Sequence, residues 1–320
     1  MTQSEPREVE HEITVDAPAD DIYRLIAEVE NWPRVFPPTI YVDQVERDGA
    51  TGPEVSTERI RIWATAHGEP KSWTSRRTLD PRTRRIDFRQ ELSTPPVAAM
   101  GGAWLIEPAG DTASRVRLLH DYRAVDDDPE SLRWIDEAVD HNSRSELAAL
   151  KENLERVHAS GELTFSFTDT VAVAGSAKDL YDFVNEADRW PVRLPHVASV
   201  TLTEDTPGLQ TLAMHTRAKD GSTHVTESYR VCLPHERIAY KQTTLPALMT
   251  LHTGVWTFTE TGDGATASSQ HTVVLAPDNI GRILGPDATV DDARTYVRNA
   301  LSTNSSATLA HAKAHAEGRA

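Results

Sequence analysis

The 320-residue chain has one cysteine, Cys232, which excludes a disulfide framework and a cysteine-based zinc site within one chain. Cys232 lies in a strand-like segment, and we expect it to be a small buried core residue. No run of 18 apolar residues occurs, and the first residues lack the basic-then-apolar pattern of a secretion signal. These absences predict a cytoplasmic protein that does not cross a membrane.

Positive charge is also scarce, because 33 Lys and Arg face 49 Asp and Glu, for a formal net charge of −16. Phosphate backbones and anionic lipid surfaces repel such a chain, so we expect no nucleic-acid or membrane partner. A hydrophobic fraction of 38% excludes a chain that is disordered throughout. The length suits two domains of roughly 150 residues each.

The second half of the chain repeats the first. Residues 13–33 match residues 171–191 at a constant offset of 158, and both segments end in Trp-Pro. Further on, Gly102-Ala103-Trp104 corresponds to Gly254-Val255-Trp256, and Asn142-Ser143 to Asn304-Ser305. A period this long excludes a solenoid. It predicts two copies of one domain, residues 1–160 and 161–320.

Each copy has the same predicted order of elements. In the first, a strand at 9–15 precedes a helix that begins near Asp16-Ala17-Pro18 and a short helix at 32–36. Six strands follow, at about 40–48, 57–66, 71–80, 84–92, 97–107 and 113–125, and then one long helix at 129–157. The second copy ends on a helix at about 290–315, after a Gly- and Pro-containing stretch at 277–286.

This order predicts an α+β chain of two tandem domains. In each, a seven-stranded antiparallel sheet wraps around the long C-terminal helix and is accompanied by two short helices. The arrangement resembles the helix-grip fold of the START and Bet v 1-like superfamily. That resemblance implies a space for a hydrophobic ligand between the sheet and the long helix.

Strand alternation selects the residues that face this space in the first copy. On residues 72–79, Trp73, Ser75 and Arg77 share one face with Leu79, and the apolar members indicate that this face points inward. The predicted inward set from the strands is Trp73, Ser75, Arg77, Phe88, Gln90, Trp104, His120 and Tyr122. We expect Trp32 and Phe36 to close the cavity from the short helix, and Asn142 to reach it from the long one.

The inward-facing arginine has two interpretations. Buried cations are rare unless they are paired or functional. Arg77 therefore either forms a salt bridge, to Asp87 or Glu58, or directs its guanidinium at ligand oxygens. His120 is likewise either a structural histidine or a chemical group. The recurrence of Asn142 as Asn304 favours a shared structural role for the two asparagines.

The second copy keeps part of the pattern. Ser228 and Arg230 recur, Thr226 replaces Trp73, and His224 shares their face. Its other predicted pocket residues are Trp190, Tyr240, Gln242, Trp256 and Asn304. Five of the seven tryptophans lie in the first copy, so we expect the two cavities to differ in shape.

Motifs for other chemistries are missing from the sequence. No P-loop, Gly-x-Gly-x-x-Gly or Gly-x-Ser-x-Gly occurs, and the thirteen histidines form no His-x3-His pair with a carboxylate on a predicted helix. We therefore expect no metal and no cofactor.

Together, Trp73-x-Ser75-x-Arg77, Trp32-Pro33, Asn142-Ser143 and the tandem units resemble the di-domain polyketide aromatase/cyclases of bacterial type II polyketide synthases. The resemblance implies aldol closure of the first ring, expected at C7–C12, and dehydration of a poly-β-ketone. It implies an acyl carrier protein with a phosphopantetheine-tethered chain as partner, together with other synthase components.

The resemblance also implies roles for individual residues. It implicates Arg77, Ser75, Trp73 and Asn142 in the reaction. Arg77 with Ser75 would stabilise the developing oxyanion. Proton donors for dehydration would come from His120 or Tyr122 in the first domain and from His224 or Tyr229 in the second, although alternation points Tyr229 outward. Arg230 and Ser228 complete the second site.

Two alternatives stay open at this point. The same cavity would suit a non-catalytic carrier or sensor of a hydrophobic ligand, with Arg77 binding a carboxylate, or a hormone-receptor-like regulatory module. The second domain either performs the dehydration or serves as a scaffold for the first.

Overall fold

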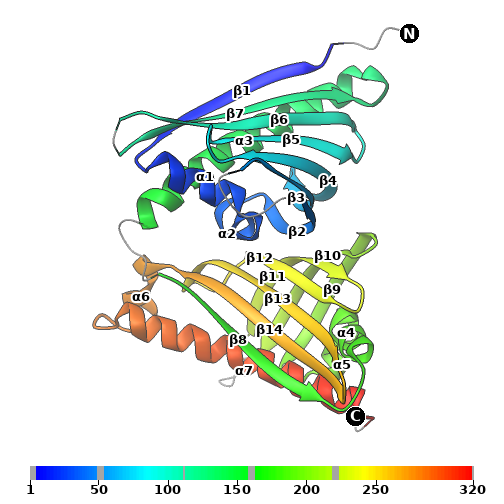
Figure 1. Ribbon diagram of the computed structural model, residues 1–320. Coiled ribbons are helices and arrows are strands. Elements are labelled where there is room, and N and C mark those ends of the chain that lie inside the picture. Colours follow the sequence, from blue (N-terminus) through cyan, green and yellow to red (C-terminus); the bar gives the residue numbers. More distant parts are fainter. Residues whose placement is uncertain (1–4, 49–53, 111, 158–162, 218–222, 319–320) are drawn as a thin grey trace. The chain divides into compact units, whose positions relative to one another are not determined.

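The computed structural model describes residues 5–48, 54–110, 112–157, 163–217 and 223–318 (Figure 1). The chain divides into two compact units, residues 1–160 and 161–320. The junction between residues 160 and 161 lies outside the described residues. Among the described residues, no helix is both long enough and apolar enough to cross a membrane.

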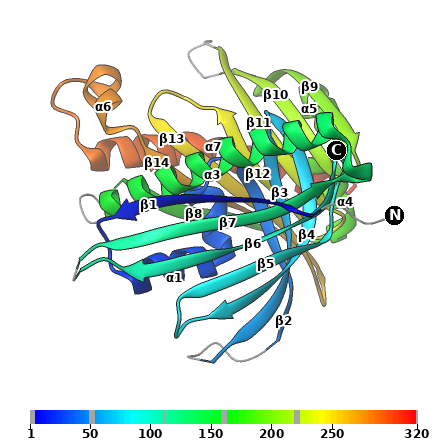
Figure 2. The ribbon, with the colours of Figure 1, turned by 90° about the horizontal axis from the view of Figure 1, so that it is seen from above.

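The first unit is a single curved sheet with one long helix (Figure 2). Its strands, in the spatial order β1-β7-β6-β5-β4-β3-β2, are all antiparallel to their neighbours. The elements are β1 (Arg7–Val15), α1 (Ala19–Ala27), η1 (Val29–Asn31), α2 (Trp32–Val35), β2 (Thr39–Asp48), β3 (Ser56–Ala66), β4 (Glu69–Asp80), β5 (Arg85–Leu92), β6 (Val97–Pro108), β7 (Ser114–Ala124), η2 (Val125–Asp127) and α3 (Pro129–Val157).

The second unit repeats this topology, with strand order β8-β14-β13-β12-β11-β10-β9. Its elements are β8 (Thr164–Val173), α4 (Ala177–Asn185), η3 (Ala187–Arg189), α5 (Trp190–Arg193), β9 (Val197–Thr206), β10 (Leu209–Arg217), β11 (Thr223–Leu233), β12 (Arg237–Thr244), β13 (Met249–Thr261), β14 (Gly264–Leu275), α6 (Pro277–Leu284) and α7 (Val290–Ala316).

These two sheets and their long helices confirm the predicted α+β fold class. Among the α-helices of the described residues, one was not predicted: α6 occupies the Gly- and Pro-containing stretch before the last helix. Pro277 stands in its first turn, where a proline costs no intrahelical hydrogen bond, and Gly285 ends it.

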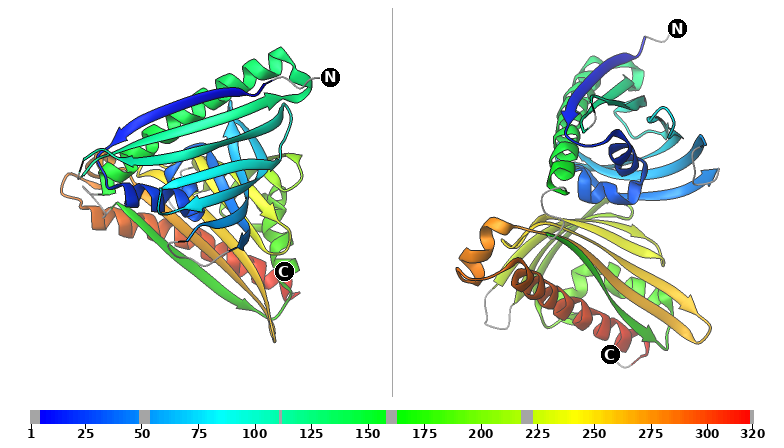
Figure 3. Two further views of the ribbon diagram at one scale, coloured as in Figure 1. Left: turned by 45° about the horizontal axis from the view of Figure 1, so that its top comes forward. Right: turned by 60° about the vertical axis from the view of Figure 1, so that its left-hand side comes forward.

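Each long helix is fixed to its sheet in the same way. Lys151 of α3 donates from Nζ to the carbonyl of Thr14 on β1 at 2.9 Å, and Lys313 of α7 donates to the carbonyl of Ala172 on β8 at 2.7 Å. Figure 3 shows each helix lying along one face of its own sheet. The apolar side chains between sheet and helix form a separate core in each unit, the first around Ile22, Ile86 and Leu150 and the second around Leu180, Ile238 and Leu309.

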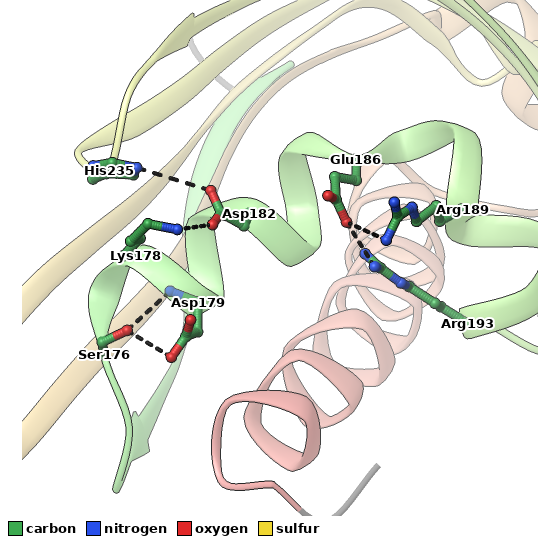
Figure 4. A network of polar contacts seen from close by, with 8 residues as sticks. All are labelled: Ser176, Lys178, Asp179, Asp182, Glu186, Arg189, Arg193 and His235. Carbon is green, nitrogen blue, oxygen red and sulfur yellow. Dashed lines mark hydrogen bonds and ion pairs between the residues drawn. The ribbon is translucent and has the colours of Figure 1, made fainter.

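Ion pairs hold the short helices of the second unit (Figure 4). Ser176 caps α4 by accepting a hydrogen bond from the backbone N–H of Asp179 at 3.0 Å. Glu186, at the end of the same helix, pairs with Arg193 of α5 at 2.6 Å. These contacts fix the turn that carries Trp190.

Gly102 of β6 lies where the first sheet has no room for a side chain. A Cβ there would lie 1.8 Å from the carbonyl oxygen of Leu119. We expect Gly102→Ala to lower the free energy of unfolding by about 1–3 kcal/mol, measured by urea titration. Gly262, where a Cβ meets nothing within 4 Å, is the control, and Gly262→Ala should leave stability within about 0.5 kcal/mol. Equal effects of the two changes would contradict this reading.

Candidate functional site

A cavity of about 150 Å³ lies between the first sheet and α3. Five residues predicted for the pocket line it: Trp32, Trp73, Gln90, His120 and Asn142. The rest of the lining is mainly apolar and comes from both the sheet and the helix: Thr39, Ile62, Ala64, Ala66, Lys71, Thr94, Pro95, Pro96, Val97, Met100, Trp134, Ile135, Ala138, Val139, Ser143 and Glu146.

Aromatic rings continue from the cavity wall into the core. The indole Nε1 of Trp32 donates to the carbonyl of Ile26 at 3.0 Å, which holds this ring at the cavity. Phe36 meets Trp32 edge-on at 5.5 Å and stacks on Trp104 at 5.9 Å. Phe36 and Trp104 are almost fully buried and do not line the cavity. They support the wall from behind.

Three residues of the sheet are direct neighbours of His120. It pairs with Gly102 on β6 and with Val9 on β1, and its ring meets the ring of Phe88 edge-on at 5.4 Å. Phe88 therefore contacts the site through His120. Burial lowers the pKa of His120 to about 4, and nearby His11 acts in the same direction, so the imidazole is neutral at pH 7. Its Nδ1 is buried without a hydrogen-bond partner among the described residues.

One face of α3 supplies polar groups to the cavity. Asn142, Ser143 and Glu146 are three and four residues apart, so they lie on the same side of the helix. The amide of Asn142 donates to the carbonyl of Thr65 at 3.1 Å. The Ser143 hydroxyl is buried and, within the described part of the chain, has no hydrogen-bond partner.

Arg77 is inward-facing as predicted but does not line the cavity. Its Nε donates to Glu58 Oε1 at 2.7 Å, which is one of the two salt bridges that the sequence leaves open. The remaining nitrogens donate to the carbonyls of Ile26 at 3.0 Å and Ala27 at 2.6 Å. The guanidinium also lies 5.1 Å from the Trp32 ring. Arg77 thus ties the last turn of α1 and the cavity wall to the sheet.

Two further predicted residues lie away from the cavity. Ser75 is buried on β4, in register with Ile60 and Gln90, at a deeper position than Trp73. Tyr122 is buried, and its hydroxyl donates to Asp136 Oδ1 at 2.5 Å. The hydroxyl proton of Tyr122 is therefore used in a hydrogen bond to a residue of α3.

The second unit contains a buried polar cluster at the corresponding place. Tyr240 Oη lies 3.2 Å from His252 Nε2 and 3.0 Å from His271 Nδ1, and the two imidazoles are 3.0 Å apart. Gln242 contacts His252 Nδ1 at 2.9 Å, and Ser269 contacts His271 Nε2 at 3.1 Å. Tyr240 and His271 both pair with Gly254, as Phe88 and His120 pair with Gly102. The cluster therefore takes the place of the Phe88–His120 contact.

Arg230 occupies the position of Arg77 but has a neutral partner. It donates to Gln210 Oε1 at 2.8 Å and to the carbonyl of Val184 at 2.7 Å, and it lies 5.2 Å from the Trp190 ring. Ser228 is buried beside it on β11.

The other predicted residues of the second unit are dispersed. Trp256 packs in the core with Trp190, and Thr226 is half-buried on β11. His224, at the start of β11, and Asn304 on α7 are exposed, in contrast to the inward positions predicted for them. For His224 the alternation gives the correct side of the strand, but the strand end extends beyond the core. For Asn304 the buried neighbour is Ser305, which donates to Asp169 at 2.6 Å.

Four site residues were missed from the sequence, and three of them had a signal. Ser143 and Glu146 lie within one helical turn of Asn142, so the inward position predicted for Asn142 could have been extended to them. His271 follows from the internal repeat, because it lies opposite the repeated glycine just as His120 does. The repeat aligns His252 with Met100 and gives no such signal. Among the described residues, no group of three or more His, Cys, Asp or Glu side chains is placed to hold a metal ion.

Comparison with known proteins covers both units. A family model described as polyketide cyclase/dehydrase and lipid transport matches residues 6–155 and 164–317. A granaticin polyketide synthase bifunctional cyclase/dehydratase of Streptomyces virginiae is 55% identical over 308 residues, which is 94% of this chain and 97% of the relative. The corresponding actinorhodin protein of Streptomyces coelicolor is 46% identical and covers 99% of both chains.

Two solved structures share the tandem arrangement. The di-domain aromatase/cyclase BexL of the BE-7585A biosynthetic pathway has a TM-score of 0.86 and 65% identity, covering 98% of this chain and 100% of its own. StfQ of the steffimycin biosynthetic pathway has a TM-score of 0.85 and 35% identity, covering 97% and 99%.

Proposed function

Because the chain belongs to the polyketide cyclase/dehydratase family, we propose that its first domain closes the first ring of a poly-β-ketone between C7 and C12. The chain is held as a thioester on an acyl carrier protein, and water is then lost from the new ring. The observation that carries this proposal is the cavity lined by tryptophans and a neutral imidazole.

The size and walls of the cavity favour formation of a single ring. A volume of about 150 Å³ is close to that of a cavity that takes up benzene. Trp32, Trp73 and Trp134 restrict how a flexible chain bends inside it. Holding the reacting carbons together supplies much of the barrier reduction in an intramolecular aldol reaction.

The remainder of the substrate does not fit into this volume and must stay outside. Lys71 and residues 94–96 lie in or beside the turns that join β4 to β3 and β5 to β6, and they line the cavity. A chain that enters there keeps its thioester and carrier protein in solution. This agrees with a tethered substrate and with other synthase components as neighbours.

His120 is suited to accept the first proton. A carbon between two carbonyls is acidic, so a modest base suffices, and the neutral imidazole has an unpartnered Nδ1. The resulting enolate attacks a ketone carbon, a C–C bond forms, and the ketone oxygen becomes a hydroxyl after protonation. The side-chain amides of Gln90 and Asn142 line the same cavity as hydrogen-bonding groups for these oxygens.

We expect His120→Gln to reduce formation of the C7–C12 ring by about 10²–10⁴-fold, because the amide keeps the polarity but cannot act as the base. The measurement is the initial rate of ring formation from a carrier-bound poly-β-ketone, with the ring position determined from the products. The control is His224→Gln, which changes an exposed histidine and should leave the rate unchanged.

Two results would contradict the proposed function. One is an unaltered rate and ring position in His120→Gln. The other is equal use of the same poly-β-ketone as a small free thioester, because the proposal requires the carrier-bound form to be preferred.

A further inference from the structure

We propose that Lys71 selects the position of the ring by binding the open end of the substrate, which is the segment between the new ring and the thioester. The proposal rests on the proposed function, because it names the group that favours C7–C12 closure over closure at other carbons. Lys71 is a specificity-determining residue in this role and takes no part in the proton transfers.

Lys71 is a half-buried cation in the wall of the cavity. Within the described part of the chain, no other Lys or Arg lines this cavity, and Lys71 has no hydrogen-bond or ion-pair partner. Arg77, on the same inward face of β4, is engaged by Glu58 and by two backbone carbonyls. A lysine ammonium has three N–H donors. Those of Lys71 are therefore available to a ligand.

The fold does not require a lysine at this position. The internal repeat aligns Lys71 with His224, which is exposed at the start of β11. Lys71 pairs across the sheet with Ala64, and both Ala64 and Ala66 line the cavity. These neighbours on β3 have short side chains, so they leave room beside the long side chain of Lys71. A cation at this place is better explained by a ligand than by packing.

The spacing between Lys71 and Trp73 matches the length of the open segment. Two residues along a strand cover about 7 Å. An extended chain advances about 1.2 Å per bond, so the six bonds from C7 to C1 also cover about 7 Å. With the new ring beside Trp73, the thioester end of the segment lies at Lys71 and at the turn between β3 and β4. This is the end that must leave the cavity to reach the carrier protein.

The chemistry of the open segment suits an ammonium. In a poly-β-ketone the C1, C3 and C5 carbonyl oxygens lie on this segment, and one ammonium can donate to two of them at once. A chain displaced by one or two carbons would lose these hydrogen bonds and leave the ammonium in a mainly apolar wall. The difference between the two positions of the chain gives the preference for one ring.

The test compares K71Q and K71M with the wild type, using the full chain and a carrier-bound poly-β-ketone. Glutamine keeps the polarity of the side chain and methionine keeps its length, and both remove the charge. We expect the ratio of C7–C12 products to products of other ring positions to fall by about tenfold or more in both variants. K71R keeps a cation and should retain most of the wild-type ratio.

A second pair of substrates separates the chain oxygens from the phosphate of the carrier arm. The same poly-β-ketone is supplied as a thioester of phosphopantetheine and as a thioester of pantetheine, which lacks the phosphate. We expect K71Q to change the ring position with both substrates. If K71Q raises only the KM for the phosphopantetheine thioester and leaves the ring position unchanged, Lys71 binds the phosphate and the proposal is wrong.

The control is K178Q, which removes an exposed lysine paired with Asp182 on α4 and should give the wild-type product ratio. An unchanged ratio in K71M would overturn the proposal, and so would a loss in K71R equal to that in K71Q, because neither result depends on the charge. Failure of the proposed function looks different, because the wild type itself would then show no preference for the C7–C12 ring.

Discussion

Arg77→Ala should lower the free energy of unfolding of the first domain by about 3–5 kcal/mol, because it leaves the carboxylate of Glu58 buried without its cation. The carbonyls of Ile26 and Ala27 lose their donors at the same time. Five of the seven tryptophans lie in the first domain, so urea unfolding followed by tryptophan fluorescence reports mainly on it. Loss of product in this variant would then follow from displacement of Trp32.

The second domain supplies the matched comparison. Arg230 makes the corresponding contacts to Gln210 and to the carbonyl of Val184, but no buried carboxylate is left when it is removed. Arg230→Ala should therefore cost less than Arg77→Ala. The double variant Glu58→Gln/Arg77→Ala should recover part of the stability lost in Arg77→Ala. An Arg77→Ala protein with unchanged unfolding and altered ring position would instead favour a direct role of the guanidinium at the substrate.

Acidification should destabilise the second domain through its two buried histidines. Burial lowers the pKa of His252 to about 3 and that of His271 to about 4, below the usual 6.5. Between these values the unfolded chain takes up protons that the folded domain does not. The stability from each imidazole is therefore complete above pH 6.5 and is lost as the pH falls, at up to about 1.4 kcal/mol per pH unit.

Removing one titrating group from this cluster should flatten the pH dependence. His252→Gln is expected to show a smaller loss of unfolding free energy between pH 6.5 and 5 than the wild type, by about 2 kcal/mol. The quantity to compare is this loss, obtained from urea unfolding at both pH values. His224→Gln, on the exposed end of β11, should match the wild type. Parallel pH profiles for all three proteins would mean that the pKa of His252 is the same in the folded and unfolded states, which would contradict this prediction.

The fold was largely predictable because its signals are local and occur twice. Alternating strands, turn residues and two long amphipathic helices appear in the same order in both halves. The predicted element boundaries were wrong where a residue typical of turns lies inside a strand or a helix. Pro70 belongs to the start of β4 instead of the preceding turn, and α6 begins at Pro277 in a stretch taken for irregular chain. In both cases the proline stands near the beginning of the element, where its missing N–H is tolerated.

The site was less predictable. Alternation shows which face of the sheet a side chain is on, but it does not show whether the position along the strand lies beside the cavity or in the packed core. Trp73, Ser75 and Arg77 share the inward face of β4, yet among them only Trp73 lines the cavity. That position depends on where α1 and the long helix cover the sheet, which is a tertiary property. Glu146 was missed for a different reason, because a charged residue on a long helix ordinarily faces solvent.

The placement of the first strand beside the last has a consequence for synthesis on the ribosome. β1 pairs with β7, so Arg7 lies opposite Tyr122, and in the second domain Thr164 lies opposite Val274. Each sheet can close only after more than one hundred further residues have been translated. All strands and the long helix of the first domain are synthesised before β14. Because translation runs from the N-terminus, the first sheet can be completed before the last strand of the second sheet is available. This order disfavours pairing of strands between the two similar copies.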